Sequence, residues 1–253
     1  MSGYHIFSQF YDNLTFNVDY EKRADYLQSV LSLWGHESGL TLDLACGTGS
    51  MTLALKERGW DIFGVDGSQD MLSIAMDKAY DKGLSVLFLC QKMEALDLYG
   101  TIDTCISTLD SLNHITDKAT LQAAFDKVAL FMNPGGLFVF DVNTVYKHQK
   151  ILGNNTFVYD TDEVYCVWKN SLKENNIINI ELDLFEKADG VYTRHSERFK
   201  ERAYEIDELK EMLKKAGFET LAVYRDMTTD ALTDDSDRAV IVARIVEVKN
   251  KED

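Results

Sequence analysis

The sequence predicts an α/β protein: a doubly wound, seven-stranded, mostly parallel sheet with an inserted antiparallel β subdomain after the fifth strand. Two observations support this fold class. Short apolar strands alternate with helix patterns over residues 36–144 and again over residues 204–250, which indicates a parallel sheet covered on both faces. Between these segments, residues 145–203 alternate with a period of two, which is typical of antiparallel strands.

Helices and strands follow one another in the alternating part of the chain. Helices are expected at residues 19–35, 50–59, 68–83, 117–132 and 207–217, where apolar residues recur every three or four positions. Each ends at a glycine or at the sequence Asn-Pro-Gly-Gly. Strands are expected at residues 40–46, 61–66, 84–90, 102–108, 137–142, 218–224 and 238–248.

The insertion is expected to contain three or four antiparallel strands. In residues 177–185, one face is apolar and the other polar, and Ala-Asp-Gly at 188–190 is a hairpin turn signal. The apolar face comprises Ile178, Ile180, Leu182 and Leu184. Because no linker interrupts the chain, we interpret residues 1–253 as one domain. It comprises an N-terminal flap and helix (1–35), a core (36–144 and 204–250) and the inserted cap (145–203).

Composition narrows the class of protein. The 253-residue chain carries a formal net charge of -16, and its densest basic stretch is interrupted by glutamates, so nucleic acid is a disfavoured partner. Its four cysteines are widely spaced and predict reduced thiols. No apolar run is long enough to span a bilayer, and no signal peptide is recognised. A cytoplasmic protein without a membrane partner is expected.

A glycine-rich turn follows the first predicted strand, in the sequence TLDLACGTGS at residues 41–50. A nucleoside triphosphate site needs a lysine after the glycines, and none follows. A dinucleotide site has a third glycine where this chain has Thr52, and Asp43 would repel a pyrophosphate. An adenosyl ligand with a cationic, phosphate-free tail fits better, because Asp43 can accept a hydrogen bond from an ammonium group or organise the turn.

A second acid, Asp66, ends the next strand. Its carboxylate can accept hydrogen bonds from both hydroxyls of a ribose, as in dinucleotide enzymes. The alternative is that Asp66 only caps a helix or shapes a turn. Together with Asp43 and the missing third glycine, it favours an adenosyl ligand.

These motifs resemble those of the class I S-adenosylmethionine-dependent methyltransferases. Asp43, Ala45, Gly47 and Gly49 match the family's first motif position by position. The resemblance covers nearly the whole chain and implies a last strand inserted antiparallel. It also implies S-adenosylmethionine as the cofactor.

The resemblance extends to two further segments. VDGSQDML (65–72) is similar to the second motif, which implies contacts from Asp66 and Gly67 near the ribose and from Met71 near the adenine. CQKMEALDL (90–98) is similar to the segment after the third strand. Met93 there would face the adenine with its backbone amide, and Lys92 stands where the family usually has an aspartate.

The N-terminal segment is dense in aromatic residues: Tyr4, Phe7, Phe10, Tyr11 and Tyr20. They either pack under the first helix or form a flap over the cofactor. The family analogy favours the flap, with Tyr11, Tyr20 or Arg23 reaching the cofactor's carboxylate.

Candidates for the chemistry lie in TLDSLNHI (108–115), after the fourth strand. Leu109 is expected to line the methionine end of the cofactor, and Asp110 and His114 to face the acceptor. The alternatives are a turn-capping Asp110 and a structural histidine at the start of a helix. His195, on the last inserted strand, either lines an acceptor pocket or is solvated or paired across strands. No metal site is predicted.

The sequence therefore predicts a methyltransferase that moves the methyl group to a nucleophilic nitrogen or oxygen of a small-molecule acceptor by in-line displacement. Its motifs are similar to those of a bacterial branch of the family, and its insertion resembles that of small-molecule N-methyltransferases. The alternatives are an RNA or protein methyltransferase and a non-catalytic protein that binds S-adenosylmethionine or S-adenosylhomocysteine. Hydrophobic edges in the insertion are compatible with a homodimer.

Overall fold

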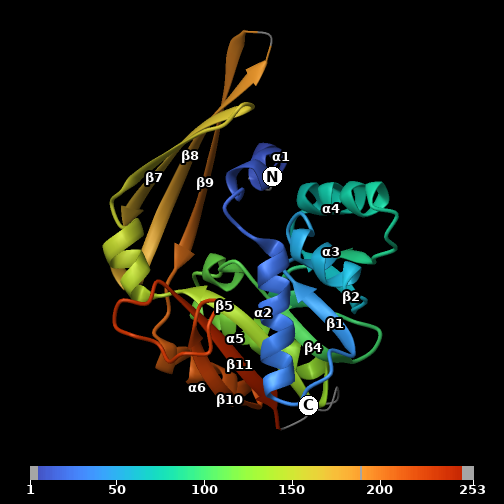
Figure 1. The fold of residues 1–253 in the computed structure, drawn as a ribbon. Helices are drawn as coiled ribbons and strands as arrows, with labels where there is room; N and C mark the ends of the chain where they lie inside the picture. Colours follow the sequence, from blue (N-terminus) through green and yellow to red (C-terminus); the bar gives the residue numbers. More distant parts are fainter. Residues whose placement is uncertain (1–4, 189, 247–253) are drawn as a thin grey trace.

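The computed structural model describes residues 5–188 and 190–246, which contain two separate sheets (Figure 1). The larger sheet is built from β1 (Leu40–Leu44), β2 (Asp61–Asp66), β3 (Phe88–Cys90), β4 (Ile102–Ser107), β5 (Met132–Asn143), β10 (Phe218–Arg225) and β11 (Arg238–Ile245). Their order is β10-β11-β5-β4-β1-β2-β3, and β11 runs antiparallel to both of its neighbours. The predicted fold class is confirmed, including the antiparallel last strand.

Helices cover both faces of this sheet: α2 (Tyr20–Leu33), α3 (Ser50–Glu57), α4 (Gln69–Asp81), α5 (Lys118–Phe131) and α6 (Ile206–Ala216). Side chains of β5 alternate between the two faces, as the pleat of a strand requires. Phe138 and Phe140 pack with α5 and α6, whereas Leu137 and Val139 pack with α2 and α3. This alternation explains why the strand is a continuous apolar run in the sequence.

The ends of two strands differ from the prediction. β3 pairs only over Phe88–Cys90, although residues 84–90 were expected to form a strand. It lies at the edge of the sheet, so apolar residues before it, such as Leu87, remain exposed. β5 begins at Met132, five residues earlier than predicted, and includes the Asn-Pro-Gly-Gly sequence.

The second sheet contains β6 (Thr156–Asp160), β7 (Val164–Leu172), β8 (Ile177–Ala188) and β9 (Val191–Arg202), all paired antiparallel in chain order. Its buried face carries Ile178, Ile180, Leu182 and Leu184, as predicted. The expected hairpin is present, because Ala188 pairs with Val191. Asp189 of its turn lies outside the described residues, as do Tyr4 and residues 247–250.

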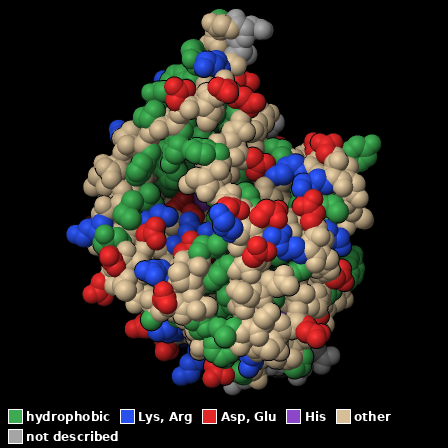
Figure 2. Space-filling view, in the orientation of Figure 1, with side chains coloured by type: hydrophobic (Ala, Val, Ile, Leu, Met, Phe, Trp, Pro, Cys, Tyr) green, Lys and Arg blue, Asp and Glu red, His purple; other side chains and the backbone are tan. Residues whose placement is uncertain are grey.

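The N-terminal helix α1 (His5–Leu14) lies between β9 of the second sheet and α4 (Figure 1). Phe7 and Phe10 pack against the hydrophobic cluster of the second sheet, while Asp12 forms an ion pair with Lys78 of α4. The surface is hollowed where hydrophobic side chains of the second sheet meet charged side chains beside the larger sheet (Figure 2). Among the described residues, no helix combines the length and apolar character that a membrane crossing requires.

Candidate functional site: two adjoining cavities

A buried carboxylate begins the glycine-rich turn at the carboxyl end of β1. Asp43 is 1% exposed, and it accepts a hydrogen bond from the Thr52 hydroxyl at 2.6 Å. Thr52 occupies the position of the third glycine in a dinucleotide fingerprint, so this side chain holds the turn instead of leaving room for a pyrophosphate. Burial raises the pKa of Asp43 to about 7. A cation bound beside Asp43 would favour the ionised carboxylate.

The two glycines of the turn are explained by different structural requirements. Both have a left-handed backbone, with φ of 56° at Gly47 and 73° at Gly49. A Cβ on Gly49 would lie 2.9 Å from the Cβ of Ala75, so close packing against α4 requires a glycine there. A Cβ on Gly47 would meet nothing within 4 Å, which leaves room for a ligand beside this part of the turn. Ala45 shares the left-handed conformation, with φ of 60°.

Asp66 joins this turn to the end of β2. One carboxylate oxygen accepts from the Gly47 amide at 2.9 Å and the other from the Ser68 amide at 2.8 Å. Ser68 caps α4 by accepting from the Met71 amide. Burial raises the pKa of Asp66, against the opposing effect of the two amides. Asp66 therefore already organises the turn in this structure, and a ribose would share these oxygens with the backbone.

The remaining residues predicted near the ribose and the adenine come from α4 and from the segments after β2 and β3, two strands that pair with each other. Gly67 lies beside Lys92, because a Cβ on Gly67 would be 3.8 Å from the Lys92 side chain. Met93 begins the short helix η1 (Met93–Ala95) and packs against the main hydrophobic core. Met71, on α4, is 5% exposed.

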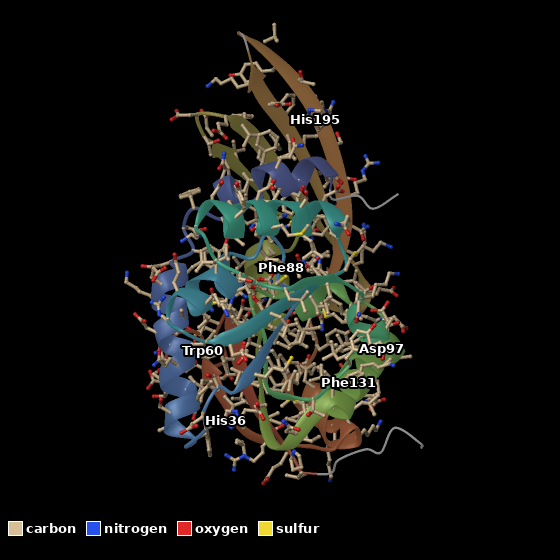
Figure 3. The ribbon with its side chains drawn as sticks, turned by 90° about the vertical axis from the view of Figure 1, so that its right-hand side faces the viewer. His36, Trp60, Phe88, Asp97, Phe131 and His195 are labelled. Atoms are coloured by element: carbon tan, nitrogen blue, oxygen red, sulfur yellow. The ribbon has the colours of Figure 1, made fainter. Side chains whose placement is uncertain are left out.

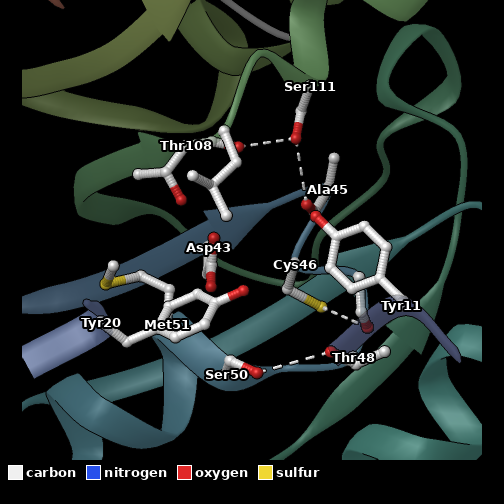
Figure 4. Close-up of a pocket in the computed structure, with 12 residues that line it drawn as sticks. Tyr11, Tyr20, Asp43, Ala45, Cys46, Thr48, Ser50, Met51, Thr108 and Ser111 are labelled. Atoms are coloured by element: carbon white, nitrogen blue, oxygen red, sulfur yellow. Dashed lines mark hydrogen bonds between the residues drawn. The ribbon is translucent and has the colours of Figure 1, made fainter. Parts of the chain in front are cut away.

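A small cavity lies directly over the glycine turn, bordered by Asp43, Ala45, Gly47, Tyr11 and Tyr20 among others (Figure 4). Its volume is about 30 Å³. The chemistry of its walls fits S-adenosylmethionine, with an acid for a cation and glycine backbone for close approach.

Helix α1 is attached to the turn by one residue. Asp12 accepts hydrogen bonds from Lys78 at 2.6 Å, from Thr48 at 2.7 Å and from Ser50 at 3.2 Å. These contacts bring Tyr11 over the small cavity. Burial raises the pKa of Tyr11 well above its usual value, so its hydroxyl remains neutral.

The loop after β4 is held in an unusual conformation by a charge network. Leu109 and Asp110 have positive φ values of 59° and 55°, which non-glycine residues rarely adopt. Their amides donate to the two oxygens of Asp141 on β5, at 2.8 and 2.7 Å. Arg238 on β11 donates to both Asp141 and Asp110. Although burial opposes its charge, Asp141, Asp110 and Asp226 raise the pKa of Arg238 well above its usual value.

A larger cavity of about 300 Å³ lies between this loop, α1 and the second sheet. Its walls are largely apolar and include several aromatic side chains, and one end is charged. The aromatic walls include Phe7, Phe157, Tyr159, Trp168 and Phe199; the charged end includes Asp110, His114, Lys147, Glu201 and Arg238. Tyr11 and Leu109 border both cavities, so the two spaces adjoin.

His114 ends the short helix η2 (Ser111–His114) and lies near a buried carboxylate. Its Nε2 is 3.8 Å from Oε1 of Glu201, a residue of β9 that is 4% exposed. Asp110, His114 and Glu201 each place a potential metal-ligand atom within 4.8 Å of the others. Arg238 already donates to Asp110, and its positive charge opposes a second cation there, so we assign no metal.

Two predicted residues lie away from both cavities. Arg23 forms a two-pronged pair with Asp226, at 3.0 Å for each nitrogen, and lies 3.5 Å from Asp141. His195 is on the projecting arm of β9, well above the larger sheet, and is 3.3 Å from Glu186 (Figure 3). The structure brings neither side chain to the cofactor turn.

Four residues at or behind the charged end of the larger cavity were not predicted from the sequence: Asp141, His148, Glu201 and Arg238. Asp141 had a signal, because it is an acid at the carboxyl end of an apolar strand, like Asp43 and Asp66. Glu201 continues the face of β9 that carries Phe199. The other two have no local signal, since their partners are distant in sequence.

The fold and the turn define a Rossmann-like methyltransferase, and comparison with known proteins agrees. A family model described as "Methyltransferase domain" matches residues 41–136. A methyltransferase of Geobacillus sp. (strain WCH70), named without a substrate, is 31% identical over 244 residues, covering 95% of this chain and 99% of the relative.

Solved structures are similar over nearly the whole chain. A crystal structure of an S-adenosylmethionine-dependent methyltransferase from Clostridium acetobutylicum has a TM-score of 0.88 and 30% identity, covering 97% of this chain and 100% of that one. The sugar N-methyltransferase KedS8 from Streptoalloteichus sp. has a TM-score of 0.77 at 20% identity, covering 94% of this chain and 93% of that one, and thus shares the fold. The chain belongs to the family of S-adenosylmethionine-dependent methyltransferases.

Proposed function

We propose that this methyltransferase acts on a nucleophilic nitrogen or oxygen of a small-molecule acceptor held in the larger cavity. The observation that carries the proposal is that Tyr11 and Leu109 form a common wall of the two cavities. A cofactor seated on the glycine turn would therefore lie next to an acceptor in the larger cavity. The acceptor atom could then approach in line with the bond that breaks.

The cofactor contacts proposed from the sequence surround the small cavity and the end of β2. When bound, S-adenosylmethionine supplies a methyl group activated by a positively charged sulfur. Asp43 would hold the ligand's cationic end, and Asp66 its ribose. The other proposed contacts are Tyr11, Tyr20, Ala45, Gly47, Gly49, Gly67, Met71, Lys92, Met93 and Leu109. Movement of α1 would admit the ligand, and reattachment through Asp12 would exclude water.

The size and walls of the larger cavity support a small acceptor. A volume of about 300 Å³ is at the lower end of the range for small-molecule sites. Its aromatic walls can orient a ring, and orientation contributes roughly 7–11 kcal/mol to favourable bimolecular reactions. The net charge of -16 disfavours an RNA substrate. The shared fold of a sugar N-methyltransferase is compatible with this acceptor class.

Calorimetry with S-adenosylmethionine, S-adenosylhomocysteine and NAD tests the cofactor part of the proposal. We expect binding of both adenosyl ligands and none of NAD. A folded protein that binds neither adenosyl ligand would contradict the cofactor assignment.

A cavity-filling variant tests the acceptor part. Ile151 lines the larger cavity, whereas its neighbour Lys150 is exposed. With a panel of amines and alcohols as acceptors and product S-adenosylhomocysteine as the readout, Ile151→Trp should abolish turnover and keep cofactor binding. The matched control Lys150→Trp should keep both. Full turnover by Ile151→Trp would exclude this cavity as the acceptor site.

A further inference from the structure

The wall of the larger cavity includes one face of the π-helix η3 (Lys147–Leu152). Lys147, Ile151 and Leu152 of this helix border the cavity, whereas Lys150 is exposed. A spacing of four and five residues is that of side chains one helical turn apart. The helix therefore presents one cation and two apolar side chains to the same space.

Hydrogen bonds at both ends of Lys147 hold it in this position. Its backbone amide donates to the Thr144 hydroxyl at 3.1 Å, and that hydroxyl donates in turn to the carbonyl oxygen of Ser236 at 2.7 Å. The ammonium group of Lys147 donates to Oδ1 of Asn143 at 2.8 Å. The lysine is thus attached to the carboxyl end of β5 and to the loop before β11.

The ammonium group of Lys147 has hydrogens that no group in the described part of the chain accepts. It carries three hydrogens, but within residues 5–188 and 190–246 it forms one hydrogen bond, to Asn143, and no ion pair. Burial and the positive charge of Arg238 lower the pKa of Lys147 against the opposing effect of nearby acids. An anion beside Lys147 would offset both effects.

Asn143 adds a second donor at the same place. Because an ammonium group only donates, the amide atom 2.8 Å from Lys147 must be oxygen, which identifies the other atom as Nδ2. Among the described residues this Nδ2 has no hydrogen-bond partner, although Asn143 is 3% exposed and borders the cavity. Its N–H groups are therefore available to a ligand in the cavity, next to the ammonium group.

The acids that border the same end of the cavity do not occupy these donors. Asp110 accepts a hydrogen bond from Arg238. The two oxygens of Glu201 lie 3.8 Å from a ring nitrogen of His114 and 3.6 Å from one of His148. Neither acid forms an ion pair with the lysine. Since like charges repel, an anionic ligand group is expected at the lysine and away from the two acids.

We propose, resting on the methyl-transfer function above, that Lys147 and Asn143 form an anion subsite and that the acceptor is a small carboxylic acid with an apolar body. A carboxylate offers two oxygens, one for the ammonium group and one for the amide. A phosphate would need donors for a third oxygen. The apolar body would lie against aromatic side chains of the second sheet, such as Phe157 and Trp168.

Calorimetry of the full chain saturated with S-adenosylhomocysteine tests this subsite without a known acceptor. The probes are benzoate, phenylacetate and indole-3-acetate, each compared with its own carboxamide. Acid and amide have nearly the same shape and differ in charge, so a difference in affinity reports the anion subsite. At least one acid should bind about tenfold more tightly than its amide, because hydrogen bonds to charged groups are the stronger ones.

Variants of the two residues assign the preference to the subsite. Lys147→Met removes the charge and should abolish the preference for the acid over the amide. Asn143→Asp replaces the amide donor by a carboxylate and should weaken binding of the acid more than binding of the amide. The matched control is Lys150→Met, which changes an exposed lysine of the same helix and should leave both affinities unchanged.

A further variant checks that the probes occupy the larger cavity. Ile151→Trp fills the space beside the subsite and should prevent binding of acids and amides alike. An acid preference that survives Lys147→Met would overturn the subsite. Tighter binding of phenyl phosphate than of every acid would overturn the assignment to a carboxylate.

The unmodified protein separates the failure of this inference from that of the proposed function. Equal affinities for acids and amides would overturn the anion subsite, whether or not any variant folds. If S-adenosylhomocysteine binds but no acid or amide does, the larger cavity is rejected as the acceptor site together with its subsite. If the amides bind as tightly as the acids and Ile151→Trp prevents both, the subsite alone is rejected.

Discussion

The turn after β1 and the loop after β4 both face the cavities, but they are held in different ways. In the turn, contacts join residues that are close in sequence: Asp43 accepts from Thr52, nine positions away, and Asp66 from Gly47, 19 positions away. In the loop, Arg238 binds Asp141 and Asp110 across 97 and 128 positions. The turn is therefore encoded locally, whereas the loop exists only once β11 has paired with β5.

The two regions also differ in which groups compensate the negative charge of a buried acid. Asp141 is compensated by Arg238 and by two backbone amides. Asp43 pairs with no cation among residues 5–188 and 190–246, and a hydroxyl is its hydrogen-bond partner. The first arrangement favours a fixed loop. The second leaves a site whose charge can respond to a cationic ligand.

The largest effect is expected from removing the cation of the loop. Arg238→Met would leave Asp110 and Asp141 without their shared partner in a buried setting, and such losses cost about 3–5 kcal/mol of unfolding free energy. Urea denaturation measures this loss. Arg225→Met is the control, since its pair with Asp230 is solvent-exposed and should cost less than about 1 kcal/mol. Equal costs for the two variants would mean that burial does not distinguish the two pairs.

Asp43 in the turn should make the folded protein less stable as the pH rises. Its carboxyl loses a proton near pH 3.8 when unfolded and near pH 7 when folded, so between these values the folded state binds the extra proton. The contribution of Asp43 to stability is therefore greatest below pH 3.8 and is lost as pH rises through 7, by up to about 4 kcal/mol.

Asp43→Asn isolates this effect, because the amide oxygen can still accept from Thr52 but does not titrate. Without cofactor, the variant should gain stability relative to the unmodified protein between pH 4 and pH 7 in urea denaturation. A stability difference that does not change with pH in this window would show that the acid titrates normally.

Features that depend on contacts local in the sequence could be predicted, whereas features that depend on distant contacts could not. The helices, the strands and the buried face of β8 are predictable from local periodicity and glycine stops, whereas the antiparallel β11 was implied by the resemblance to the family. The turn is predictable for the same reason, and so is the position of Asp66. The hydrogen bond from Thr52 to Asp43 was not predicted, because Thr52 was considered only as a replacement for the third glycine of a dinucleotide fingerprint.

The charged end of the larger cavity was predictable only in part. Asp110 and His114 were proposed as site residues from their place after β4, but their partners Arg238 and Glu201 come from strands far along the chain. Arg23 was assigned to the cofactor because it is a nearby cation in the sequence. Its pairing with Asp226 depends on a tertiary contact across 203 positions, which no local pattern reveals.

A pair of glycine variants tests whether the turn depends on packing or on backbone conformation alone. Gly49→Ala adds a Cβ 2.9 Å from Ala75 and 3.2 Å from Phe88 in a left-handed backbone, so it should cost about 3 kcal/mol of unfolding free energy. Gly47→Ala has the same backbone strain in open space and should cost about 1 kcal/mol. Equal costs in urea denaturation would indicate that the contact with α4 relaxes.

The last prediction concerns cofactor affinity at the end of β2. Asp66→Ala removes the acceptor of the Gly47 and Ser68 amides as well as the proposed ribose contact, and should weaken S-adenosylhomocysteine binding more than tenfold in calorimetry. Asp66→Asn keeps one oxygen but loses the charge and the second acceptor. If the carboxylate binds the ribose, both variants weaken binding. Because both oxygens also accept from backbone amides, Asp66→Asn should weaken binding even if the carboxylate only shapes the turn. Normal affinity in Asp66→Ala would remove Asp66 from the site, and the turn would then rely on the backbone of Gly47 and Gly49 alone.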